Sequence, residues 1–358
     1  MSGEGAEGHA VPVWLISLRD LQWRRRRFII AVVSAALAFA LTLLLEGTVA
    51  HMRSEGPRVV NMFGADGWVV ADGASGPFTT AQLLPAAATG AIAAIPGVTA
   101  ASPLLVGRAT VKDVDVNLVG YERGGVTEPP KVRSGRLPDR SGEALVDSSL
   151  GLRPGENVTI LGRSFPIVGT TSGTTFYFGQ ATVFLPIEDV QQTLLAGQPL
   201  ASAIVVRGRP GALPAGLTLM TDAQVTKDLA RPLGQSAQTL TMINGLLWLT
   251  AAGVIGSIIY MTALERQRDV AVLKATGAST RSLLGGLAFE ALVLAGTAAV
   301  IAGVLALLLE PLFPFPVEIP VKAYVKLVVV AVVVGLIASA AGGRRISRVD
   351  PALAFGGA

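Results

Sequence analysis

Residues 245–278 read GLLWLTAAGVIGSIIYMTAL followed at once by ERQRDVAVLKATGA. The first part is long and apolar enough to span a membrane as a helix. The second part keeps helical spacing, with charged i,i+3 pairs formed by Glu265 with Arg268 and by Arg266 with Asp269. Gly277 fits the left-handed position that ends a helix. A helix that stays ordered after leaving the membrane needs something to pack against, so this stretch predicts a membrane protein that contacts a soluble partner.

The composition of the whole chain also indicates a membrane protein. Of its 358 residues, 51% are hydrophobic and 15% are charged, and its mean hydropathy is +0.56; soluble domains carry about 25% charged residues. Four segments are apolar over enough residues to cross about 30 Å of hydrocarbon, whereas the long interval from His51 to Thr239 has ordinary globular composition. We therefore expect an α-helical membrane protein with four transmembrane helices and a large extracytoplasmic α+β domain inserted between the first and second helices.

Basic residues beside the spans predict the orientation. Arg24 to Arg27 precede the first span, Arg266 to Arg281 lie between the second and third, and Arg344 to Arg348 follow the fourth. The positive-inside rule puts these groups in the cytoplasm and the inserted domain outside, although Lys322 and Lys326 at the outer end of the fourth span weakly oppose it. The expected division is a tail with an interfacial elbow helix at 1–27, spans at 28–50, 240–264, 284–309 and 322–341, a domain with its stalk at 51–239, a cytoplasmic region at 265–283, an extracellular loop at 310–321 and a cytoplasmic tail at 342–358.

Local patterns predict several elements of the inserted domain. Polar and apolar residues alternate at residues 114–118, which is the period of a half-buried strand. Two apolar runs flank Gly162 and Arg163, as in a hairpin, and Thr221 is placed to cap a helix that starts at Asp222. The remaining expected elements are a helix capped by Thr79 or Thr80 that runs to about Ile95, a helix at 187–195 that follows Pro186, a strand at 203–207, and an interruption of the stalk near 232–234.

Several function classes lack their required residues. The sequence contains no G-x-x-x-x-G-K-[ST] motif, no cysteine, and only two histidines, His9 and His51. A P-loop, a zinc site and a Ser-His-Asp triad are therefore not expected. Basic and acidic residues number fifteen each between His51 and Thr239, so the pI of about 9.6 reflects juxtamembrane charge and not a nucleic-acid surface. We expect no enzyme activity, no metal and no nucleic acid.

The segment at residues 265–278 resembles the E-R-x-x-E-[IL]-A-x-L-[RK]-A-x-G-A signature of FtsX-like (MacB-type) ABC transporter permeases, with Asp269 in place of the usual Glu. The tail at 344–355, RRISRVDPALAF, is similar to the ending of the same family. Short motifs at 95–98, 135–138 and 143–147 resemble the family's periplasmic core domain. The resemblance covers nearly the whole chain in order, and its C-terminal third is the most specific part.

The resemblance implies a permease subunit in a bacterial plasma membrane, with both termini cytoplasmic, that forms a homodimer and works with a separate ABC ATPase. That ATPase would bind ATP and Mg, so no cofactor is expected in this chain. The implied ATPase-coupling residues are Glu265, Arg266, Arg268, Asp269, Leu273, Lys274, Gly277, Ala278 and Arg281, the implied C-terminal contacts are Arg344, Arg348, Asp350 and Pro351, and the intramembrane polar residue is Glu290. Each set has a plainer alternative. The coupling residues could form a solvated juxtamembrane helix, the C-terminal residues a basic stop-transfer flank, and Glu290 an interfacial or paired carboxylate.

In this family, ATP-driven movement of the ATPase is passed through the membrane to the outer domain, a mechanism called mechanotransmission. The implied outcome is export or extraction of an amphiphile such as a lipid, lipoprotein or peptide. Force relay to an extracellular cell-wall enzyme and transport of a small solute such as an amino acid stay open. An ATP-independent membrane scaffold or sensor is the alternative outside transport. The expected partners are therefore the ATPase, a second copy of the chain, membrane lipid and an extracellular protein.

Overall fold

The computed structural model describes residues 25–129, 131–177, 179–265, 279–313 and 317–347. The chain forms two compact units, one made of Met1–Ala50 with Thr239–Ala358 and the other of His51–Gln238. The elbow helix expected before residue 25 lies outside the described residues. We call the first unit the membrane unit and the second the inserted domain.

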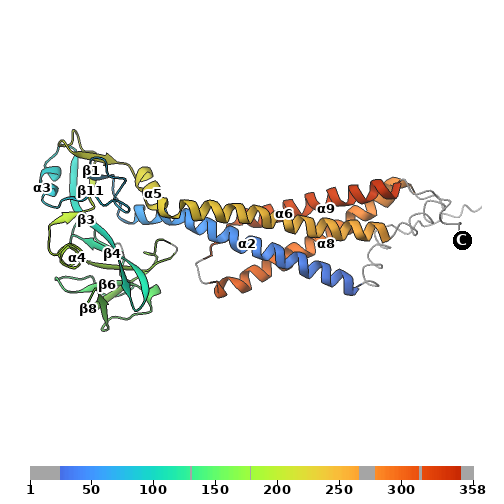
Figure 1. Ribbon diagram of the computed structural model, residues 1–358, viewed down its shortest axis with the longest axis horizontal. Coiled ribbons are helices and arrows are strands. Elements are labelled where there is room, and N and C mark those ends of the chain that lie inside the picture. Colours follow the sequence, from blue (N-terminus) through green and yellow to red (C-terminus); the bar gives the residue numbers. More distant parts are fainter. Residues whose placement is uncertain (1–24, 130, 178, 266–278, 314–316, 348–358) are drawn as a thin grey trace, which may run out of the picture. The chain divides into compact units, whose positions relative to one another are not determined.

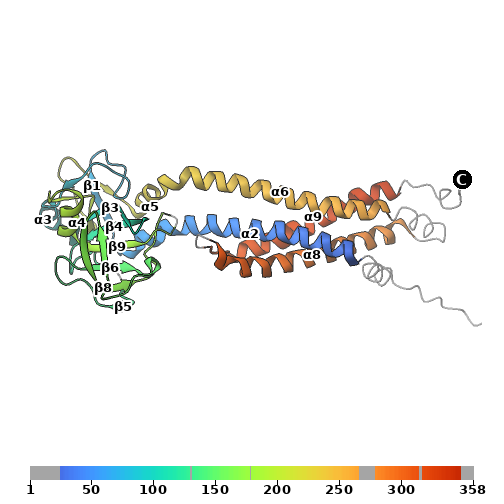
Figure 2. The ribbon, with the colours of Figure 1, turned by 60° about the horizontal axis from the view of Figure 1, so that its bottom comes forward.

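Four long helices build the membrane unit and lie side by side in both views (Figures 1 and 2). They are α2 (Arg25–Met62), α6 (Gly234–Glu265), α8 (Thr280–Leu309) and α9 (Val321–Ser347). Each contains a stretch that is long and apolar enough to cross a membrane, which confirms the four predicted transmembrane helices. Both α2 and α6 continue beyond their apolar stretches, so the last turns of α2 and the first turn of α6 belong to the inserted domain.

Small side chains let the helices of the membrane unit pack closely. Its buried core includes Ala35 and Ala40 of α2, Ala251 of α6 and a series of alanines on α8 that continues from Ala291 to Ala306. Interfaces between membrane helices favour small residues because these allow the backbones to approach. At Gly47 a Cβ atom would come within 2.6 Å of a side-chain carbon of the segment before α9, so this position has room only for glycine.

The inserted domain is built on one mixed sheet. Its strands are β1 (Gly67–Ala71), β3 (Val98–Val111), β4 (Val114–Tyr121), β5 (Ser134–Gly135), β6 (Ala144–Asp147), β7 (Asn157–Ile160), β8 (Arg163–Thr171), β9 (Thr182–Pro186), β11 (Ala203–Gly208) and β12 (Leu217–Met220). The order is β12-β1-β11-β3-β4-β9-β6-β8-β5, with β7 paired to β8. The pairs β4–β9 and β6–β8 are parallel and the others antiparallel. A separate two-stranded sheet joins β2 (Leu84–Pro85) to β10 (Leu200–Ala201).

Most of the local predictions for this domain are confirmed. The strand at 203–207 is β11, and the predicted hairpin is β7–β8. The alternating segment is β4, but the expected half-burial is wrong: Val114 is exposed, whereas Asn117 is buried because its amide donates to backbone carbonyls at 3.0 and 3.3 Å. The turn residues of the hairpin, Leu161 and Gly162, both have positive φ, at 47° and 81°, as tight hairpin turns require. Pro186 precedes α4 (Ile187–Leu194), and Thr221 caps α5 (Asp222–Ala230) in a full capping box. The short helix η2 (Arg231–Leu233) forms the predicted interruption before α6.

The prediction that Thr79 or Thr80 caps the next helix is wrong. The helix there is α3 (Ala88–Ala93), and neither threonine caps it. The Thr79 hydroxyl instead donates to the Asp228 carboxyl group of α5, and the Thr80 hydroxyl accepts the Gln82 N–H at 2.9 Å. A contact with a residue far along the chain thus replaced the local cap.

The remaining short elements are η1 (Ser148–Leu150) and η3 (Glu310–Leu312). The proline-rich segment after the third span was expected to stay out of helix. It begins with the single 3-10 turn of η3, which ends at an extended Phe313, and residues 314–316 lie outside the described residues.

Candidate functional site: the stalk and the helix ends

The predicted coupling segment joins α6 to α8. Glu265 is the exposed last residue of α6, and Arg281 lies in the first turn of α8. Arg344 lies in the last turn of α9, and these helix ends gather at the same end of the membrane unit as the start of α2 (Figures 1 and 2). The other predicted contact residues lie outside the described residues, namely Arg266, Arg268, Asp269, Leu273, Lys274, Gly277, Ala278, Arg348, Asp350 and Pro351.

Glu290 lies within α8 and is 7% exposed. The side chain is therefore buried against neighbouring helices. The neighbouring residue Ala291 packs against Gly335 of α9, whose Cβ would lie 3.5 Å from the Ala291 carbonyl oxygen. An ionisable side chain at such a position is expensive to bury and commonly serves a function.

A polar cluster links three helices of the membrane unit. It was not predicted from the sequence. The Lys326 Nζ of α9 lies 3.1 Å from the Glu46 Oε2 of α2, and the Trp248 Nε1–H of α6 donates to the same oxygen at 3.3 Å. The ammonium group also lies 4.8 Å from the centre of the Trp248 ring, within cation–π range. This pairing gives Lys326 a partner at the outer end of the fourth span, where its charge weakly opposed the predicted orientation. The available signal was the acidic Glu46 in the first apolar span and the lysines Lys322 and Lys326 in the fourth.

Residues 222–238, which we call the stalk, comprise α5, η2 and the first turn of α6. Two contacts hold α5 to the rest of the inserted domain. The Trp68 Nε1–H of β1 donates to Asp222 Oδ1 at 2.8 Å, and the buried Asp228 accepts the Phe78 N–H at 2.9 Å. A Cβ at Gly76 would lie 2.3 Å from the Asp228 Cγ, so the loop between β1 and β2 can approach the helix only with glycine there.

The end of α2 shares a hydrophobic core with the stalk. Val59, Val60 and Phe63 pack in the same buried cluster as Val225 and Leu229 of α5. The two helices pass so close that a Cβ at Gly56 would lie 3.0 Å from the Thr226 Cγ2. The last turns of α2 and the helix α5 are therefore part of one packed core in the inserted domain.

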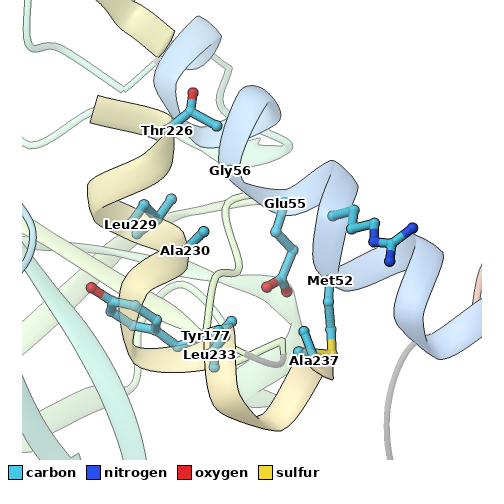
Figure 3. Close-up of a pocket in the computed structure, with 11 residues that line it drawn as sticks. Met52, Glu55, Gly56, Tyr177, Thr226, Leu229, Ala230, Leu233 and Ala237 are labelled. Atoms are coloured by element: carbon cyan, nitrogen blue, oxygen red, sulfur yellow. The ribbon is translucent and has the colours of Figure 1, made fainter. Parts of the chain in front are cut away.

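A pocket opens between the end of α2 and the stalk (Figure 3). It encloses about 190 Å³ and is lined mainly by apolar side chains. We call it the stalk pocket, and it is lined by Met52, Arg53, Glu55, Gly56, Tyr177, Thr226, Leu229, Ala230, Leu233, Gly234 and Ala237. All of these residues belong to the inserted domain.

Glu55 and Tyr177 supply the buried polar atoms at this pocket. Glu55 is 2% exposed, and its Oε1 accepts the Gly179 N–H at 2.9 Å and lies 3.3 Å from the His51 Nε2. Tyr177 has a positive φ of 54°, which is uncommon for a residue other than glycine. Its hydroxyl donates to the Phe78 carbonyl at 3.2 Å, and the Arg108 guanidinium lies 4.5 Å from its ring centre. Burial raises the pKa of Tyr177, so the phenol stays a hydrogen-bond donor.

A second buried acid supports the far part of the domain. Glu143 accepts hydrogen bonds from both terminal nitrogens of Arg136, at 2.7 and 2.6 Å, and from the Arg140 Nε at 2.8 Å. The hydrogen bonds from Arg136 lower the pKa of Glu143 to about 2. Among the residues that the structure describes, no group of three His, Cys, Asp or Glu side chains could hold a metal ion. The two arginines thus hold the Glu143 carboxyl group in place.

Comparisons with known proteins agree over most of the chain. A family model for the MacB-like periplasmic core domain matches residues 28–218, and one for the FtsX-like permease C-terminal region matches residues 241–351. An ABC transporter permease of Mycobacterium tuberculosis strain H37Rv is 43% identical over 345 residues, which are 95% of this chain and 99% of the relative. A second permease of the same strain is 40% identical over the same shares.

A crystal structure of the periplasmic region of MacB from Actinobacillus actinomycetemcomitans is also similar, at 14% identity and a TM-score of 0.34, over 47% of this chain and 94% of that one. The identity with the mycobacterial relatives and the two family models decide the assignment. This chain belongs to the ABC transporter permeases of the MacB/FtsX type.

Proposed function

We propose that two copies of this chain form the permease of an ABC exporter and pass movement from a cytoplasmic ATPase pair to the inserted domains, which lie outside the cell. In this proposal Glu265–Ala278 rests on the ATPase and both chain termini are cytoplasmic. The observation that carries the proposal is the continuity of α6. This helix runs from Gly234 in the stalk to Glu265 at the start of the coupling motif, with no break between them.

The contacts at the upper end of α6 support the same proposal. A helix transmits movement only if its end is fixed to the body that has to move. The stalk is fixed by the Trp68–Asp222 hydrogen bond, by the Asp228 contacts and by the core shared with α2. A displacement of α6 along or across its axis would therefore be passed on to the sheet of the inserted domain.

The chemistry of the spans favours an amphiphilic cargo such as a lipid, a lipoprotein or a peptide. A groove of about 440 Å³ lies between α6 and α9 and is lined almost wholly by apolar side chains, among them Val334 and Ile337. The charged side chains of Glu46 and Lys326 are engaged with each other. The described spans therefore offer an apolar surface for a cargo and little for a hydrated solute.

Copurification tests the partnership first. The wild-type chain and the double variant Arg268→Glu/Leu273→Asp are purified in detergent together with the ATPase encoded beside the gene. We expect the wild type to retain the ATPase and the double variant to lose it, because the variant reverses one charge and adds another on the side that the sequence predicts to be apolar. A folded wild-type chain that retains no ATPase would support the scaffold or sensor alternative.

A distance measurement tests the transmission of movement. The chain has no cysteine, so Ala223→Cys on the exposed side of α5 gives one spin label per copy. We expect one distance between the two labels of a homodimer, and a change in it when ATP binds. A Gly-Ser-Gly-Ser insertion after Leu233 should abolish the change while the ATPase stays bound, whereas the same insertion after Gly162, in the β7–β8 turn, should not. An ATP-dependent change that survives the first insertion would refute transmission through the stalk.

A further inference from the structure

The stalk pocket has the size of a small-molecule site. Its free volume is about 190 Å³, and an apolar cavity of roughly 150 Å³ admits a benzene molecule. Leu229 and Leu233 from the stalk and Met52 from α2 form its apolar walls (Figure 3). A ring or a short length of alkyl chain would therefore fit, and the hydrophobic gain would come from covering these side chains.

The pocket differs from an ordinary apolar cavity in having a buried acid on its wall. In Figure 3 the Glu55 side chain points from α2 toward the side of the pocket that Ala237 and Tyr177 line. The carboxyl group is almost fully buried, so its interaction with a ligand is weakly screened by solvent. Arg53 also lines the pocket but is exposed, so water and salt screen its charge. Of the two charged side chains that line the pocket, Glu55 therefore interacts more strongly with a ligand inside it.

Tyr177 completes the wall, and its conformation is held in place. The positive φ of this residue is unfavourable for a side chain other than glycine, so the surrounding contacts must hold it. The Phe78 carbonyl, the Arg108 guanidinium and the Phe176 ring all contact Tyr177. The aromatic wall is thus present before any ligand arrives, which lowers the ordering cost of binding.

We propose that the stalk pocket binds a cationic amphiphile, with its apolar ring or chain against Met52, Leu229 and Leu233 and its ammonium group donating to Glu55. An ammonium group offers three donors and a positive charge, an alcohol offers one donor, and an ionised carboxylate offers none. The preference of the pocket should follow that order for ligands with the same tail. The proposal names a cargo class for the proposed exporter, and its test needs neither ATP nor the ATPase.

Protection of a single cysteine tests the site in the full chain. Ala230→Cys places the only thiol of the chain at the pocket, and Ala223→Cys places one on the same helix outside it. Each variant is reconstituted in lipid nanodiscs, and the rate of maleimide labelling is measured with decylammonium, decanol or decanoate at matched amounts in the bilayer. These three probes share one tail and differ in donors and charge.

We expect decylammonium to slow labelling at position 230 and to leave position 223 unchanged. Decanol should require about tenfold more ligand, the equivalent of one charge-assisted hydrogen bond, and decanoate should give no protection. Glu55→Gln should remove the preference for the ammonium group, and its amide oxygen can still accept the Gly179 N–H, so the fold should be kept. Equal protection by the three probes, protection at neither position, or a preference that survives Glu55→Gln would each overturn the proposal. Copurification of the ATPase is unaffected by any of these results.

Discussion

Asp228 is the residue whose loss should most weaken the hold of the stalk on the inserted domain. Its carboxyl group is 1% exposed and accepts the Phe78 N–H at 2.9 Å and the Thr79 hydroxyl. Asp228→Ala removes the acceptor for both donors at once. The loop between β1 and β2 would then lose both of these polar contacts with α5.

The expected cost follows from these two hydrogen bonds. A hydrogen bond to a charged group contributes about 1.5–3 kcal/mol, and a buried donor left without a partner costs about 1–3 kcal/mol. Taking the lower end for each bond gives a loss of about 3 kcal/mol in the free energy of unfolding of the inserted domain. For a domain of 150–250 residues, each kcal/mol lowers the melting temperature by about 2–4 °C, so the expected decrease is about 6–12 °C.

Differential scanning calorimetry of the full chain in detergent measures this decrease. Asp228→Asn keeps one acceptor oxygen and should lose about half as much. The matched control is Asp115→Ala, an exposed aspartate of β4 that accepts from the Thr110 hydroxyl at 3.4 Å, and it should change the melting temperature by less than about 2 °C. If Asp228→Ala melts within that same range, the stalk is not held by this residue and the argument for a fixed stalk fails.

Three further changes test other parts of the structure. Glu46→Lys should lower the thermal stability of the membrane unit, because two ammonium groups would then face each other, and adding Lys326→Glu should restore most of the loss; a double variant as unstable as the single one would contradict the ion pair. Hydrogen bonds from Arg136 lower the pKa of Glu143 to about 2 from its ordinary 4.5, so its contribution to stability is complete above pH 4.5 and is lost as the pH falls toward 2. Glu143→Gln should therefore flatten the fall in melting temperature across that window, and parallel curves would argue against it. Gly47→Val should prevent the helices from packing, because even a Cβ would come within 2.6 Å of a neighbouring side chain; a normal gel-filtration profile and melting curve would refute this.

The elements that could be predicted are those whose signals are local. The spans follow from apolar runs, β4 from its period of two, the β7–β8 hairpin from its turn at Gly162, and α5 from the capping residue Thr221. In each case the residues that specify the element lie inside it or beside it. The structure confirms these elements.

The elements that could not be predicted depend on distant contacts. The first helix continues to Met62 although its apolar run ends near Ala50 and Pro57 lies in its interior, because Val59 and Val60 are buried in the domain core. The threonine at position 79 looked like a helix cap but binds an aspartate 149 residues away. A single sequence gives no sign of such a pairing.

The candidate site divides in the same way. The coupling segment was found from its motif, and the roles of its residues stay predictions. The stalk pocket was not found, because Met52, Tyr177 and Leu229 come from three distant segments that only the folded domain brings together. The ion pair had a signal, an acid in the first span and two lysines in the fourth, and the sequence did not show which of these charges meet.

The pairing of Glu46 with Lys326 also has a consequence for how the protein is made. The two residues are 280 positions apart in the chain, and ribosomes add about 5–20 residues per second. The first span therefore resides in the membrane for on the order of 15–60 seconds before its partner has been synthesised. A charged residue in a span costs about 2.5–3.5 kcal/mol at the centre of the bilayer, and less toward its surface. The insertion machinery thus has to accept the first span before Lys326 is available to pair with Glu46. The ion pair can form only after the span that carries Lys326 has been synthesised.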